Sequence, residues 1–275
     1  MLRPPDPAKL VDLARWPILA LDSPVGREVV RAARDELSRL GMAVLPGFLR
    51  ADALPGLLAE CESLAPRGHF SEIVGTPYIE APDPSLPADH PRRTLQRTAL
   101  TAVAYDLFPP DSALRALYEW EPLKDFVRVL LAKEKLFRYA DPFGALNLAS
   151  MRAGDELHWH YDQTDFVVSI AIQASDAGGE FECVPKIRAS GDENYPRVAK
   201  VLASAPDAGI STIPMNPGTF MLFEGRNSIH RVAPIRGARP RYVALLAYDT
   251  KPGTDSSPLL KRVRYGRLPG EVSTS

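Results

Sequence analysis

The second half of the chain alternates short apolar runs with turn signals, and this rhythm limits the possible folds more than any other feature. Strand-like runs fall at residues 146–151, 166–174, 210–214, 218–223 and 241–248. Glycines such as Gly178-Gly179 and Gly218 mark the turns. Runs of this length without alternating helices indicate antiparallel strands rather than βαβ units. One short polar helix is expected as an insertion at 193–203.

The first half has helical periodicity instead. Helices are predicted for residues 26–40, 51–65 and 114–131, the last broken at Pro122. Residues 66–97 hold eight glycines and prolines, so we expect an ordered loop without regular structure there. The predicted fold class is α+β, a double-stranded β-helix (jelly roll) with flanking N-terminal helices. We expect a single domain over 1–275, with a helical lead-in at about 1–135 and a jelly-roll core at about 136–267.

One strand carries the residues that suggest chemistry. In Leu157-His158-Trp159-His160-Tyr161-Asp162, alternation directs His158, His160 and Asp162 to the same face. Two imidazoles and a carboxylate together are costly to bury without a purpose, and they suit a metal ion. Among the three other histidines, His230 is the strongest candidate for a further ligand, because it follows the apolar run at 218–223.

His160-x-Asp162, the distant His230 and an arginine that opens a later strand resemble the iron(II)/2-oxoglutarate-dependent oxygenases. The resemblance implies that His160, Asp162 and His230 bind Fe(II), with 2-oxoglutarate and O2 as co-substrates. It also implies that Arg241 pairs with the far carboxylate of 2-oxoglutarate, because a guanidinium grips a carboxylate with two hydrogen bonds. Arg239 is the competing choice, although Pro240 places it in the preceding turn.

The resemblance narrows to one branch, the free-amino-acid radical halogenases and their hydroxylase relatives. The matching segments lie at 89–93, 139–142, 154–160, 178–182, 225–232 and 264–267. The halogenases carry glycine or alanine where this chain has Asp162, so the resemblance implies hydroxylation. The expected reaction is hydroxylation of an unactivated C–H bond in a small polar substrate, either a free amino acid or a metabolite derived from one.

Candidates for binding these small molecules follow from the same comparison. Asn147 is a further candidate for the co-substrate site. The substrate candidates are His158, Arg92, Arg93, Asp141 and Gln163. A hydrogen bond that orients one of the metal ligands is an equally good role for His158, and surface charge is the simplest interpretation of Arg92 and Arg93. Leu245 and Ala247 share a strand face with Arg241, and their apolar character argues against a lysine substrate.

The overall composition excludes several kinds of partner. The 275 residues carry a formal net charge of −1, which argues against nucleic acid or a membrane surface. No apolar stretch reaches the roughly 20 residues of a membrane span, and the N-terminus lacks a signal-peptide core. Cys61 and Cys183 are too few for a disulfide framework. We expect a cytoplasmic protein with a small-molecule substrate, and the sequence leaves its oligomeric state open.

Two other classes of function stay open at the level of sequence. His158-x-His160 with Asp162 and His230 also suits a cupin-type metal dioxygenase or isomerase that does not use 2-oxoglutarate. A non-catalytic metal-binding or interaction domain is the other alternative. A 2-oxoglutarate-dependent oxygenase forms succinate with each product, whereas the cupin-type enzyme does not. Failure to turn over any small molecule with iron and 2-oxoglutarate would favour the non-catalytic domain.

Overall fold

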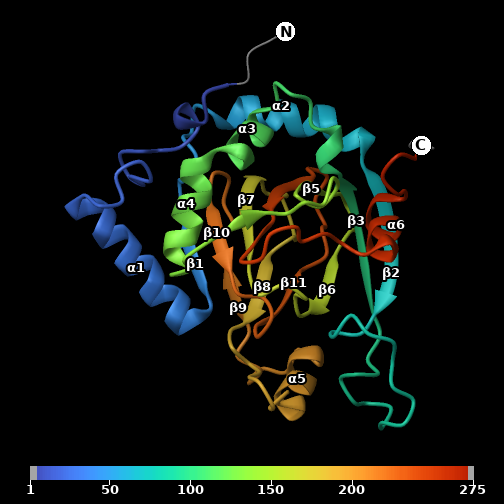
Figure 1. The fold of residues 1–275 in the computed structure, drawn as a ribbon. Helices are drawn as coiled ribbons and strands as arrows, with labels where there is room; N and C mark the ends of the chain where they lie inside the picture. Colours follow the sequence, from blue (N-terminus) through green and yellow to red (C-terminus); the bar gives the residue numbers. More distant parts are fainter. Residues whose placement is uncertain (1–4, 272–275) are drawn as a thin grey trace.

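Two antiparallel sheets form the centre of the molecule in the computed structural model, which describes residues 5–271 (Figure 1). The major sheet has the strand order β1 (Met42–Leu45), β10 (Phe220–Phe223), β7 (Val167–Gln173), β12 (Arg241–Leu246), β5 (Leu146–Met151), β3 (Gln96–Val103) and β2 (His69–Gly75). The minor sheet has the order β6 (Leu157–His160), β11 (Ile229–Val232), β8 (Phe181–Val184) and β9 (Ser211–Ile213). A short ladder pairs β4 (Phe137–Arg138) with β13 (Tyr248–Asp249). The α+β jelly-roll prediction is confirmed.

Helices cover one face of the major sheet. They are α1 (Pro24–Leu40), α2 (Leu54–Leu64), α3 (Ala113–Glu119) and α4 (Glu121–Leu130). Ser23 caps α1 by accepting a hydrogen bond from the N–H of Gly26, and Gly41 ends the helix with φ 65°. Two later helices, α5 (Tyr195–Leu202) and α6 (Pro258–Tyr265), lie away from this layer (Figure 1). Short 3-10 helices occupy Pro7–Lys9, Ala65–Arg67 and Tyr105–Leu107.

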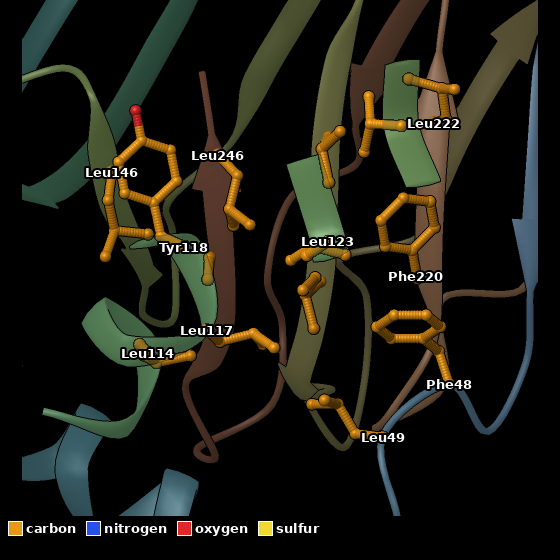
Figure 2. Packing of buried hydrophobic residues seen from close by; sticks show 14 of the residues in the cluster. Phe48, Leu49, Leu114, Leu117, Tyr118, Leu123, Leu146, Phe220, Leu222 and Leu246 are labelled. Atoms are coloured by element: carbon orange, nitrogen blue, oxygen red, sulfur yellow. The ribbon is translucent and has the colours of Figure 1, made fainter. Parts of the chain in front are cut away.

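The main core lies between these helices and the outer face of the major sheet. Phe48, Leu123, Phe220 and Leu246 are fully buried there, and Phe48 and Phe220 pack with ring centroids 4.9 Å apart (Figure 2). A second cluster fills the space between the two sheets, around Met151, Phe181 and Phe223. The central strands β5, β7 and β12 of the major sheet therefore have two buried faces, and the inner one leads to the candidate functional residues.

Two expectations about the first half need correction. Residues 66–97 are not without regular structure, because β2 and the start of β3 fall within them and pair along seven residues. The division near residue 135 also fails, since β1, β2 and β3 precede it and belong to the major sheet. Tertiary pairing makes these segments strands, although their local sequence does not favour regular structure.

No helix among residues 5–271 combines the length and the apolar character that crossing a membrane requires.

Candidate active site and metal centre

Three side chains with metal-ligand chemistry meet at the end of the minor sheet. His160 ends β6 and is paired in register with His230 on β11. Asp162 follows two residues later, and its backbone N–H donates to the carbonyl of Gly225 at 3.2 Å. Nε2 of His160 and Nε2 of His230 lie 3.9 and 3.6 Å from Asp162 Oδ1. The potential ligand atoms all lie within 4.8 Å of one another, close enough to share one ion.

The main chain orients both imidazoles. His160 Nδ1 lies 2.7 Å from the carbonyl oxygen of His158, and His230 Nδ1 lies 2.9 Å from that of Ser228. A carbonyl oxygen only accepts, so each Nδ1 carries the hydrogen and donates it. Burial, reinforced by His230, lowers the pKa of His160 to about 3, so this ring is neutral at physiological pH. The Nε2 lone pairs are left for a metal ion.

The carboxylate of Asp162 completes a donor set that fits iron. Its Oδ2 is buried and has no hydrogen-bond partner among residues 5–271. Burial raises the pKa of Asp162, but His230 and His160 together hold it below its ordinary value. Room for the carboxylate exists because residue 225 is glycine: a Cβ there would lie 2.6 Å from Asp162 Cγ. Two imidazoles and one carboxylate with an unsatisfied oxygen match the ligand set of non-haem Fe(II).

Arg241 is the buried cation of the inner face. It opens β12 and is 6 % exposed, and within the described part of the chain its side chain has one contact of hydrogen-bond type, Nη1 to Met151 Sδ at 3.9 Å. No carboxylate among the described residues lies within ion-pair distance of it. Burial lowers the pKa of Arg241 to about 10, which leaves it charged at neutral pH. Arg239, by contrast, is exposed, and its backbone N–H donates to Asp176.

Asn147 lies further along the same inner face. It is buried on β5, directly opposite Leu245 of β12. Its Oδ1 lies 3.5 Å from Nη2 of Arg264, which reaches it from α6. Arg264 is absent from the candidates predicted from sequence. The signal for it was its place in the segment 264–267, which matched the related enzymes but carried no predicted role.

A polar cavity of about 320 Å³ opens beside Asp162. Of the predicted substrate residues, Arg92 and Gln163 line it. Arg92 forms an ion pair with Glu80 at 2.7 Å, at one wall of the cavity. Tyr161 and Tyr195 contribute aromatic surface to other walls. The loop before β3 and the start of α5 thus meet next to the metal centre.

The remaining candidates have partners within the protein. His158 is buried, with Nδ1 against the Thr98 hydroxyl and Nε2 3.3 Å from the carbonyl oxygen of Thr76. Arg93 donates to the carbonyl of Leu86 at 2.7 Å. Asp141 is 1 % exposed, accepts from the N–H of Phe143, and has Lys261 Nζ 3.8 Å from its Oδ1. The structure therefore brings Arg92 and Gln163 to the cavity, but gives Arg93 and Asp141 structural contacts.

Comparison with solved structures identifies the class of this fold. The chain is similar to SnoN, the non-haem alpha-ketoglutarate-dependent epimerase from nogalamycin biosynthesis, solved with Fe3+, alpha-ketoglutarate and nogalamycin RO (TM-score 0.57, 16 % identity, 90 % of this chain and 93 % of SnoN covered). AviO1 from Streptomyces viridochromogenes Tue57 gives a TM-score of 0.55 at 21 % identity, over 83 % of this chain and 97 % of AviO1. A Pseudomonas putida prolyl-4-hydroxylase gives 0.50 at 14 % identity, over 79 % and 97 %. At these identities the likenesses show a shared fold, and within it His160, Asp162 and His230 lie close enough together to hold one ion.

The family can be stated more narrowly. The family model described as Halogenase D matches residues 89–259, and the chain belongs to this family. No curated protein sequence matches the chain. The resemblance inferred from the sequence motifs is confirmed, and it favours an oxygenase over the cupin-type alternative.

Proposed function

We propose that this protein hydroxylates an unactivated C–H bond of a small polar substrate, a free amino acid or a metabolite derived from one. The observation that carries the proposal is Asp162, whose carboxylate lies beside both imidazoles with one oxygen unsatisfied. Its charge and its place fill the position that the resembling halogenases leave open with glycine or alanine. We further propose that residues 1–275 act as one domain.

In this proposal each described residue has a physical task. His160, Asp162 and His230 hold iron, and Arg241 holds the far carboxylate of 2-oxoglutarate. When bound, iron and 2-oxoglutarate supply oxidising power from O2, with succinate and carbon dioxide as by-products. The protein positions the reactants and excludes water, for which the apolar cluster around Met151 and Phe223 is suited.

The environment of Arg241 supports 2-oxoglutarate as the co-substrate. Buried guanidinium groups without acidic partners are costly unless an anion joins them. Arg241 meets this description, so an anionic co-substrate accounts for its position. A cupin-type reaction without 2-oxoglutarate gives this arginine no comparable task.

The test begins with the purified protein, Fe(II), 2-oxoglutarate and the proteinogenic amino acids, with succinate and product mass as readouts. We expect one succinate per hydroxylated product and one iron per chain. His160→Ala and His230→Ala should each lose iron and activity, and Asp162→Ala should lose most hydroxylation. Asp165→Ala is the matched control, because this exposed carboxylate lies three residues from Asp162 and pairs with Arg226. Full activity in His230→Ala would contradict the ligand assignment.

Asp162→Gly tests the choice of hydroxylation. This change opens the carboxylate position and removes one negative charge, which chloride can restore. We expect most hydroxylation to be lost, with some chlorinated product when chloride is present. Hydroxylation by Asp162→Gly at the native rate in halide-free buffer would show that Asp162 does not bind iron.

A further inference from the structure

The C-terminal segment around α6 carries four cationic side chains, and they do not share one role. Three have carboxylate partners: Lys261 pairs with Asp255 and Asp141, Arg262 with Glu271, and Arg267 with Asp106. Arg264 differs. Within residues 5–271, no carboxylate lies within 4.0 Å of its guanidinium.

Arg264 also points inward, unlike its exposed neighbour Arg262. Its Nε is buried and has no hydrogen-bond partner among the described residues. Its Nη2 reaches Asn147 on the inner face of β5 at 3.5 Å, a long contact that leaves donors of the guanidinium available. Its charge is close enough to the metal centre to be one of those that lower the pKa of Asp162. Helix α6 packs against β2 and β3, and this packing fixes the backbone from which the Arg264 side chain extends (Figure 1).

The residues beside Asn147 on and after β12, Leu245 and Ala247, are apolar and cannot pair with the charge of Arg264. Leu245 lies opposite Asn147 in register, and Ala247 follows two residues later, just beyond the end of β12. Both are partly exposed although they lie on the inner side of the sheet, so they face a space that solvent can enter. An unpaired guanidinium beside an apolar wall suits a ligand that has a carboxylate at one end and a hydrocarbon at the other.

Arg241 does not serve this space. It precedes Leu245 by four residues on β12, which corresponds to about 13 Å along an extended strand. Among residues 5–271, two guanidinium groups on the inner side of the sheet therefore have no acidic partner, one at each end of β12. Two separate anionic groups can be held at once.

We propose that Arg264 determines substrate specificity by binding the free carboxylate of an amino acid whose aliphatic side chain lies along Leu245 and Ala247. This inference rests on the proposed function and narrows its substrate class. It explains why α6 places one arginine without an acidic partner next to the metal centre. It also excludes residues inside a peptide and decarboxylated amines as good substrates, because neither offers a free carboxylate.

The experiment compares leucine, isoleucine and valine with their amides, which lack the carboxylate. Binding is measured anaerobically by calorimetry on the protein loaded with Fe(II) and 2-oxoglutarate, and turnover by product mass. We expect the native protein to prefer an amino acid to its amide. Arg264→Ala should weaken binding of that amino acid at least about 30-fold and leave binding of the amide unchanged. Arg264→Lys should restore part of the preference.

Arg262→Ala is the matched control, since Arg262 lies on the same helix and pairs with exposed Glu271. It should bind both probes like the native protein. The affinity for 2-oxoglutarate, measured in every variant, reports whether the fold is intact. If Arg264→Ala weakens 2-oxoglutarate and spares the amino acid, Arg264 serves the co-substrate and the inference is overturned.

Equal losses for amino acid and amide would also overturn it, because Arg264 would then support the structure only. The proposed function fails in a different way. If the native protein forms succinate with none of the proteinogenic amino acids, the inference about Arg264 is refuted, whereas the proposed function is refuted only if metabolites derived from amino acids give no succinate either. If it hydroxylates one of them while Arg264→Ala keeps the native preference, only the inference about Arg264 is refuted.

Discussion

The two faces of the major sheet differ although the same strands form both. On β12, Tyr242, Ala244 and Leu246 point to the helices and join an almost wholly apolar core (Figure 2). Arg241 and Leu245 alternate with them and point inward, where Asn147 and Ser169 are also buried. The outer face has the composition of a structural core. The inner face keeps buried polar groups, including Arg241, which has no carboxylate partner among the described residues, and such groups are typical of a binding site.

Arg241→Ala should have the largest effect on the inner face. The dicarboxylate would lose a buried bidentate contact worth on the order of 2–5 kcal/mol, which corresponds to about 30-fold to several-thousand-fold weaker binding. The requirement for 2-oxoglutarate, measured from succinate formation, should rise accordingly. Arg239→Ala is the control, because that side chain is exposed. A large effect of Arg239→Ala with none of Arg241→Ala would reverse the assignment of the two arginines.

Leu246→Ala should have its effect on the outer face alone. Leu246 is 1 % exposed in the helix-covered core, and such truncations lower the free energy of unfolding by about 2–5 kcal/mol. The folded protein should keep its affinity for 2-oxoglutarate. Urea titration and succinate assays measure the two quantities. Leu245→Ala is the paired variant on the inner face, for which we expect the smaller loss of stability and the larger change in substrate binding.

Gly225→Ala tests the inner side of the molecule by adding a single methyl group beside Asp162. A Cβ at this position collides with the Asp162 carboxylate, so the carboxylate must move. We expect iron affinity to fall about 10- to 100-fold, the range found when groups that orient metal ligands are changed. Gly56→Ala is the control, because a Cβ there meets nothing within 4 Å. Iron titration and circular dichroism check both variants, and native iron affinity in Gly225→Ala would contradict the geometry.

The sequence predicts those parts of the fold whose local pattern agrees with their final environment. Helix α1 and strands β5, β7 and β12 lie close to their predicted positions, because their apolar residues repeat with the period of the element that forms. Strand β2 was missed because most of its side chains are exposed, so its sequence has no apolar alternation. Helix α6 was missed because it is charged and leaves Leu259 74 % exposed.

The candidate site shows the same limit. Spacing alone brought His160 and Asp162 together, and the order of strand-like runs suggested His230. The contact between Asp141 and Lys261 joins residues 120 positions apart, and no local sequence pattern predicts it. For the same reason Arg264 had no predicted role, since its importance depends on where α6 packs. The binding roles of Arg92, Gln163 and Asn147 stay predictions.

The two imidazoles that we propose as iron ligands each donate a hydrogen bond to a backbone carbonyl two residues earlier in the chain. Side-chain replacement cannot remove such an acceptor, since every amino acid supplies one. Mutation can therefore alter the third ligand position while the histidine pair keeps its orientation. Because the orientation of the histidines does not depend on residue 162, evolution can replace this residue and so exchange hydroxylation for halogenation without changing the histidine pair.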